Sequence, residues 1–155
     1  MAALRGLLGR LLPARPPRRR VPAEQPACQA LDYSGPAHIS YAPHPDGVAD
    51  PGEVVWTWVP YEDNPGKGKD RPVVVIARVK DDLLVVLLSS KDHAGEPDWV
   101  PLGRGAWDAE GRASFVRLNR VLRVAPAAVR REGATLDRNR FDALAAELRR
   151  RHGWS

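Results

Sequence analysis

Short apolar runs of strand length, rather than helix length, fill the middle of this chain of 155 residues. Residues 53–59 alternate between two faces, residues 72–79 form a nearly continuous β-branched run, and residues 83–88 form a third apolar run after a tight turn at Asp81-Asp82. Further strands are expected at 98–102, 113–118 and 121–124, the last two being one long strand or two short ones. No helical pattern separates these strands, so a doubly wound fold is excluded and a small, curled antiparallel barrel is predicted.

The end of the chain carries a clear helical pattern. Asp137 can cap a helix that runs from Arg138 to about Arg151. Its apolar stripe consists of Phe141, Leu144, Ala145 and Leu148. A shorter helix is expected to start at Pro126 and to end at Gly133. The predicted fold class is therefore mainly β with α (α+β), a barrel with the C-terminal helix packed on it.

The first 50 residues differ from the rest in composition because eight prolines interrupt them. Residues 1–20 contain six arginines and no acidic residue, so the total formal charge of +5 leaves −1 for residues 21–155. A phosphate site in the folded part therefore has to be a local cluster. We expect residues 1–50 to be a Pro-rich, Arg-rich, largely disordered tail and residues 51–155 to form the barrel domain.

Within that tail, residues 2–12 have the leucine spacing of one helical face. Such a basic amphipathic helix would contact an anionic membrane or a partner's groove; the alternatives are a frayed tail or a start codon placed too early. The sequence contains no secretory signal and no membrane span, and the single Cys28 excludes an internal disulfide. A cytoplasmic protein is the expectation.

The signatures of common enzyme classes are absent from the sequence. It has no nucleophile elbow, no phosphate-binding loop motif and no zinc-protease motif. The four histidines are scattered and there is one cysteine, so no zinc set is available. We therefore expect neither a metal nor a cofactor.

A charged loop between the first two predicted strands offers a phosphate site. Lys67, Lys69 and Arg71 end this loop where the second strand begins. The strand would therefore fix the backbone position from which the Arg71 side chain extends. A planar guanidinium with five donors suits two phosphate oxygens at once. The alternative is a solvated loop in which Arg71 pairs with Asp70 or Glu62.

Two later pairs of polar residues are candidates for the same site. Ser89 and Ser90, followed by Lys91, Asp92 and His93, come at the exit of the third strand, where hydroxyls donate to a phosphate, orient a ribose hydroxyl or simply cap a turn. Arg117 and Asn119 point the same way from a strand, about 6.6 Å apart, with Arg120 and Arg123 as further positive charge. The alternative for this second pair is an ordinary polar outer face of a strand.

The tryptophans at positions 56, 58, 99 and 107 form a fourth group. Exposed tryptophans beside basic residues would be platforms for stacking bases. Core packing is the expected role for most of them.

The order in which these groups occur is more specific than any of them alone. The chain reads Gly52-Glu53-Val54-Val55-Trp56, then Gly66-Lys67-Gly68-Lys69-Asp70, Arg71-Pro72 and Leu88-Ser89-Ser90. This order resembles the MazF/PemK family of toxin endoribonucleases over about residues 50–130, with the last helix as a plausible extension. The resemblance implies an SH3-like barrel of the CcdB/MazF type, usually a homodimer.

The resemblance also implies an activity and partners. The activity is sequence-selective cleavage of single-stranded RNA without a metal, in which a ribose 2′-hydroxyl attacks the adjacent phosphorus. The products are a 2′,3′-cyclic phosphate and a 5′-hydroxyl. The implied partners are single-stranded RNA, a cognate antitoxin protein, and operator DNA through the complex with that antitoxin.

By position, the family's catalytic residues fall on Arg71, on Ser89 or Ser90, and on Arg117 and Asn119. The further substrate-binding candidates are Lys67, Lys69, Glu62, His93 and Arg120. Asn119 stands where PemK-type members have Asp, and an amide cannot take or give a proton as a carboxyl can. Either Glu62 or His93 is then the base, or the protein is a slow or inactive copy that binds nucleic acid or a protein.

Overall fold

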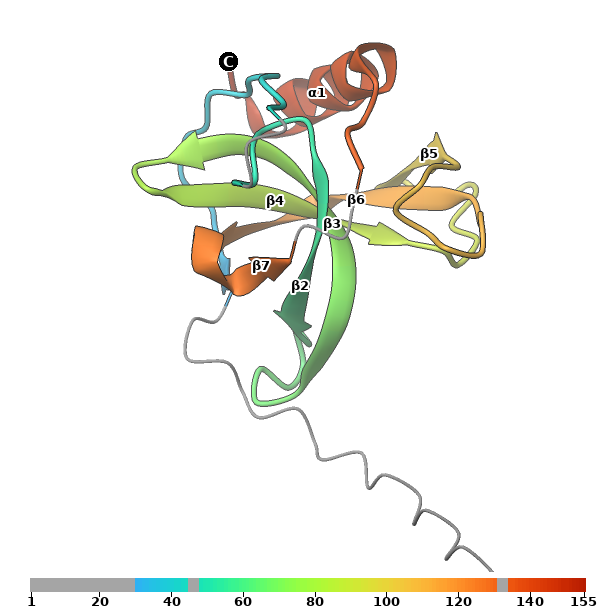
Figure 1. Ribbon diagram of the computed structural model, residues 1–155, viewed down its shortest axis with the longest axis horizontal. Coiled ribbons are helices and arrows are strands. Elements are labelled where there is room, and N and C mark those ends of the chain that lie inside the picture. Colours follow the sequence, from blue (N-terminus) through green and yellow to red (C-terminus); the bar gives the residue numbers. More distant parts are fainter. Residues whose placement is uncertain (1–29, 45–47, 131–133) are drawn as a thin grey trace, which may run out of the picture.

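The computed structural model describes residues 30–44, 48–130 and 134–155, and the predicted helix at 2–12 and Cys28 lie outside these residues. Seven strands form one antiparallel sheet in the order β1-β6-β4-β3-β2-β7, with β5 paired to β6 beside this path (Figure 1). The strands are β1 (Leu31–Asp32), β2 (Val54–Pro60), β3 (Gly68–Val79), β4 (Asp82–Ser89), β5 (Trp99–Gly103), β6 (Ser114–Val124) and β7 (Val129–Arg130). The helices are the 3-10 turn η1 (Pro126–Ala128) and α1 (Arg138–His152). The sheet curls and α1 lies on one side of it, which confirms the predicted fold class.

Two apolar clusters, one on each face of the curled sheet, explain why β3 reads as a continuous apolar run. Along this strand Val74 and Ile76 belong to the cluster that includes α1, whereas Val73 and Val75 belong to the other. All four are fully buried. A strand whose two faces are both covered has no polar face to alternate with, so the predicted burial of this run is confirmed.

The C-terminal helix follows its sequence signals closely. The Asp137 side chain accepts from the Arg140 N–H at 3.1 Å, and Gly153 ends the helix in the left-handed region at φ 68°. The predicted stripe is buried at Phe141, Leu144, Ala145 and Leu148. Burying each large apolar side chain contributes about 1.5–3 kcal/mol, so this face holds the helix on the sheet.

Predicted boundaries differ from the structure at the turn after β3 and at the helix expected from Pro126. The tight turn is Lys80-Asp81, one residue earlier than expected, and Asp82 already pairs with Val79. The predicted helix from Pro126 is a single 3-10 turn, because the chain returns to the sheet as β7 and pairs with β2. Its predicted end at Gly133 lies outside the described residues. Of the two alternatives left open for residues 113–124, the structure has the single long strand, over residues 114–124.

The segment before residue 51 is also part of the packed structure where it is described. Ala30 and Ile39 are buried, β1 pairs with β6, and the Tyr41 hydroxyl donates to the Leu136 carbonyl at 2.7 Å. A largely disordered tail is predicted over residues 1–50, whereas the described residues of this segment contribute buried side chains, namely Ala30, Ala37, Ile39, Ala49 and Asp50. Prolines prevent regular structure but do not prevent packing, which is why composition placed the boundary too late.

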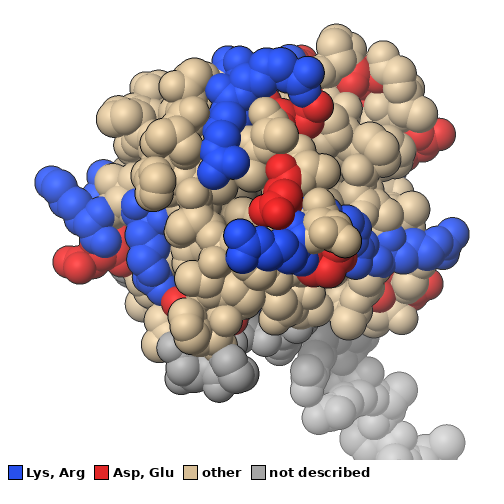
Figure 2. Space-filling view, turned by 90° about the horizontal axis from the view of Figure 1, so that it is seen from above, with Lys and Arg blue, Asp and Glu red and all other residues tan. Residues whose placement is uncertain are grey.

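Charges of both signs are mixed on the face that includes α1 (Figure 2). Ion pairs join neighbouring side chains there, including Arg138 with Asp142 and Arg151 with Asp98. This face therefore presents no broad basic surface, which agrees with the formal charge of −1 for residues 21–155. Within the described residues, no helix has the length and apolar character needed to cross a membrane.

Candidate functional site

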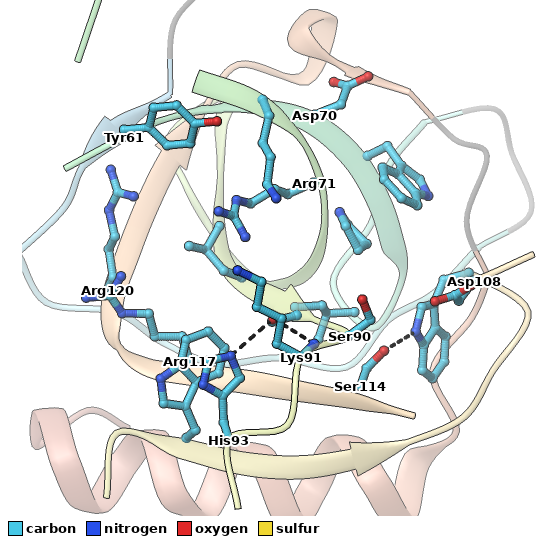
Figure 3. Close-up of a pocket in the computed structure, with 18 of the residues that line it drawn as sticks. Tyr61, Asp70, Arg71, Ser90, Lys91, His93, Asp108, Ser114, Arg117 and Arg120 are labelled. Carbon is cyan, nitrogen blue, oxygen red and sulfur yellow. Dashed lines mark hydrogen bonds between the residues drawn. The ribbon is translucent and has the colours of Figure 1, made fainter. Parts of the chain in front are cut away.

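A cavity of about 720 Å³ lies where the β2–β3 hairpin, the end of β4 and the start of β6 meet (Figure 3). Most of the predicted site residues line it, namely Arg71, Ser89, Ser90, Arg117, Lys69, Glu62, His93 and Arg120. Lys67 and Asn119 do not line it. The fold thus brings together groups that lie up to 58 positions apart in the sequence, from Glu62 to Arg120.

The hairpin that carries Arg71 is longer than predicted. Pairing of β2 with β3 continues to Pro60 and Gly68, so Arg71 lies inside a strand and not at its start. Gly68 allows this extension, because a Cβ there would lie 2.2 Å from the Val59 carbonyl oxygen. Lys69 and Arg71, two residues apart in an extended strand, therefore point to the same face and into the same cavity.

The Arg71 guanidinium faces the cavity without a partner (Figure 3). Among the described residues it forms no hydrogen bond and no ion pair, because Asp70 pairs with Arg130 and Glu62 pairs with Arg117. The predicted alternative, Arg71 held by Asp70 or Glu62, is therefore wrong. Partial burial lowers the pKa of Arg71, and Arg120 and Arg117 lower it further while Tyr61 acts in the opposite direction. An anion in the cavity would relieve this uncompensated charge.

Two lysines extend the positive cluster around Arg71. The Arg71 charge, followed by burial and by the Lys91 charge, lowers the pKa of Lys69. In the described part of the chain, neither Lys69 nor Lys91 forms an ion pair. Three cations therefore share one cavity with no carboxylate bound to any of them, which is the arrangement expected of an anion site.

Ser89 begins a chain of contacts along one wall of the cavity. Its buried Oγ accepts from the Lys91 N–H at 3.2 Å and lies 3.2 Å from His93 Nε2. The other ring nitrogen, Nδ1, contacts the Glu96 carboxylate. The His93 ring stacks on Trp99 with centroids 3.6 Å apart and planes at 2°. Ser90 lines the cavity as an exposed residue.

Arg117 and Asn119 share a face of β6, as predicted. The Arg117 Nε donates to Asn119 Oδ1 at 2.6 Å, while its Nη1 pairs with Glu62 across the cavity mouth. Leu118, which lies between them in the sequence, and Val116, which precedes Arg117, are buried, as expected for alternate positions of a strand. Arg117 is thus oriented by two partners, one neutral and one charged.

Arg120 has a different role in the structure from the one its charge suggested. Its side chain is buried, with Nε donating to Asp32 at 2.9 Å and Nη2 donating to the Pro60 carbonyl at 2.9 Å. It therefore ties β1 and the end of β2 to β6. Its Nε and Nη2 are engaged as donors, and its charge still acts on Arg71.

Three of the four tryptophans lie outside the core, contrary to the prediction. Trp107 alone of the four is buried, with its Nε1 donating to Ser114 Oγ at 3.0 Å. Trp56, Trp58 and Trp99 are only partly buried, and Trp56 and Trp99 line the cavity. The expectation that most of them belong to the core is therefore wrong, because the cavity interrupts the packing on this side of the sheet.

Several lining residues were not predicted. Tyr61 directly adjoins the candidate Glu62, so its position in the sequence was the available signal, whereas Lys91 belongs to the predicted group that runs from Ser89 to His93. Asp108 and Arg112 come from the loop after β5, whose approach to the cavity no local pattern indicated. Within the described residues, no group of three or more His, Cys, Asp or Glu side chains is placed to hold a metal ion.

Comparison with known protein families identifies one family that matches this chain. The model of the PemK-like, MazF-like toxin of type II toxin–antitoxin systems matches residues 50–151. No curated protein matches the sequence. Among solved structures 20 chains match, including one in the crystal structure of MazE-MazF (Form-II) from Deinococcus radiodurans, with a TM-score of 0.50 and 17% identity. That match covers 71% of this chain and 100% of the other, and at this identity it concerns the fold alone.

Proposed function

Because the chain belongs to the family of PemK-like, MazF-like toxins of type II toxin–antitoxin systems, we propose that it is a sequence-selective endoribonuclease that cleaves single-stranded RNA without a metal. The observation that supports this most is the unpaired Arg71 guanidinium, which faces a cavity shared with Lys69 and Lys91. A cavity with this charge and with Trp56 and Trp99 in its wall suits a phosphate flanked by nucleobases.

In the proposed reaction the ribose 2′-hydroxyl attacks the adjacent phosphorus and the 5′-oxygen leaves. Negative charge grows on the non-bridging oxygens as the new bond forms, so donors placed beforehand around the phosphorus lower the barrier. Arg71 supplies a planar fork for two of these oxygens, and Lys69 adds charge beside it. Arg117, oriented by Asn119, faces the same phosphate, while Ser89 and Ser90 position the substrate.

The proposed partners follow from the same family. A cognate antitoxin protein would neutralise the toxin, operator DNA would be bound through the complex of the two, and the toxin would act as a homodimer in the cytoplasm. These partners concern surfaces outside the cavity, so they can be tested separately from cleavage.

A second function is a binding module without catalysis. Two observations favour it, namely the amide at position 119 and the engagement of Glu62 by Arg117, because each removes a carboxylate that would otherwise accept a proton. The cationic cavity would then bind RNA without cleaving it.

One experiment separates these functions. The full chain is incubated with mixed single-stranded RNA in EDTA, and the products are examined for 2′,3′-cyclic phosphate ends. Arg71→Ala is the test variant. Arg123→Ala is the matched control, because Arg123 pairs with Asp82 outside the cavity.

We expect cleavage at a short recurring sequence by the native chain and by Arg123→Ala. For Arg71→Ala we expect a loss of about 10²–10³-fold in kcat, the usual effect of removing one donor to a developing anion. Intact RNA with a retained gel shift would favour the binding module. Equal cleavage by Arg71→Ala and the native chain would refute the site assignment.

A further inference from the structure

One wall of the cavity holds a chain of side-chain contacts that runs from Glu96 through His93 to Ser89. His93 contacts Glu96 through Nδ1 and Ser89 Oγ through Nε2, the latter at 3.2 Å. An ionised carboxylate only accepts hydrogen bonds, so the proton of the neutral ring has to be on Nδ1. Nε2 is then left with a lone pair directed at the Ser89 hydroxyl, which is the tautomer a base requires.

The Ser89 hydroxyl is oriented to complete this chain. Its oxygen already accepts from the Lys91 N–H at 3.2 Å, so its own hydrogen is free to point to His93 Nε2. Ser89 lines the cavity although it is almost fully buried. Its oxygen can therefore receive a proton from a hydroxyl bound in the cavity while its own proton moves to His93.

The imidazole is held in this orientation by its neighbours. It stacks on Trp99 at 3.6 Å, and the edge of Phe115 lies against it with centroids 5.9 Å apart at 74°. Only 16% of the His93 side chain is exposed. By contrast, His152 Nε2 donates to the Leu118 carbonyl at 2.7 Å and does not line the cavity. A packed ring loses little conformational freedom when a substrate binds, which favours His93 as a base over a carboxylate that is more exposed to solvent.

Glu62, the other candidate base among the predicted residues, is already engaged. Its carboxylate pairs with Arg117, and its side chain is 52% exposed at the cavity mouth. Taking a proton would cost it this ion pair. Of the two predicted candidates, the histidine is therefore the one left to accept a proton.

We propose that His93 is the base of the reaction, that it acts through Ser89, and that Glu96 is a positioning residue that sets its tautomer; this inference rests on the proposed endoribonuclease function. The 2′-hydroxyl proton moves to Ser89 Oγ as the Ser89 proton moves to His93 Nε2. The 2′-oxygen forms its bond to phosphorus, and the bond from phosphorus to the 5′-oxygen breaks. Solvent water gives a proton to the leaving 5′-oxygen and takes one back from His93, so no proton is gained or lost.

The test is the pH dependence of RNA cleavage by the full chain. Glu96, on the same loop, contacts His93. The other charged groups near His93 are Lys91 on this loop and Arg117 on β6 (Figure 3). Variants His93→Gln and Glu96→Gln are compared with His38→Gln, an exposed histidine that contacts Ser155 outside the cavity. Added imidazole with His93→Ala tests whether a free base restores the lost group.

We expect the native rate to fall tenfold per pH unit on the acidic side, and this limb to vanish in His93→Gln together with a drop in kcat of about 10²–10⁴-fold at little change in KM. Glu96→Gln lowers kcat less and shifts the limb, His38→Gln changes neither, and imidazole restores His93→Ala. A native chain that cleaves while His93→Gln keeps its rate and its acidic limb would overturn this inference and leave the proposed function standing. A native chain that cleaves no RNA would overturn both.

Discussion

Arg117 donates a 2.6 Å hydrogen bond from Nε to the side-chain oxygen of Asn119, two residues further along the same strand. The amide orients the guanidinium without cancelling its charge, which a carboxylate at position 119 would do. Asn119 lies outside the cavity lining, whereas Arg117 lies in it. Asn119 is thus suited to holding the Arg117 guanidinium in place rather than to moving a proton.

Replacing Asn119 by Asp tests this division of roles. Because His93 is the proposed base, Asn119→Asp is expected to leave kcat nearly unchanged. The added charge near Arg117 should raise KM up to about fivefold, the factor that about 1 kcal/mol of screened interaction gives. Steady-state cleavage of one RNA substrate measures both constants. A large increase in kcat would instead assign the base to position 119.

Glu62 is expected to limit the affinity of the cavity for RNA. In Glu62→Gln, Arg117 loses its carboxylate partner and faces the cavity with its full charge. RNA affinity should rise by up to about fivefold, since exposed ion pairs of this kind are worth about 1 kcal/mol or less. Its salt dependence should become steeper by about 0.7 in slope if one more phosphate is contacted. Binding titrations at several salt concentrations give both quantities, and unchanged affinity would show that Arg117 does not face the phosphate.

Leu148 tests how α1 is held on the sheet. This side chain is fully buried in the cluster that joins the helix to the strands. Leu148→Ala removes apolar contacts and leaves a cavity, so the free energy of unfolding should fall by about 2–5 kcal/mol. Urea titration measures this loss as a lower midpoint at an unchanged m-value. Glu147→Ala, at a half-exposed position of the same helix that pairs with Arg150, serves as the control and should change little.

Asp137 is expected to make stability depend on pH at the acidic end. The hydrogen bond from the Arg140 side chain, followed by that from the Arg140 N–H, lowers the pKa of this capping carboxylate. The folded state therefore favours the ionised form, and its stabilisation is present above the ordinary aspartate pKa of about 4 and is lost as the pH falls below it.

Asp137→Asn keeps a capping oxygen but does not titrate. Its melting temperature should therefore fall less than that of the native chain when the pH is lowered through this range. Parallel curves for the two proteins would show that the cap does not contribute to the acid dependence.

The elements of the fold could be predicted because their signals are local. The alternation in β2, the continuous run in β3 and the stripe of α1 each lie within one element, and the order of motifs led to the family that the comparisons identify. The packed segment before residue 51 could not be predicted, because its contacts, such as Tyr41 with Leu136, join positions 95 apart and follow no period. The start of β3 at Gly68 and the short strand β7 also differ from the prediction because they depend on pairing with β2, which no local pattern indicates.

The sequence by itself determined which groups are available: an arginine after the charged loop, two hydroxyls at the end of β4, and an arginine beside an amide on β6. Only the tertiary structure decided which of the arginines stays unpaired. Asp70 pairs with Arg130 and Glu62 with Arg117, so among the residues that the structure describes Arg71 is left free to face the cavity. An ion pair depends on a few ångströms between side chains of different strands, and strand register, not composition, sets that separation.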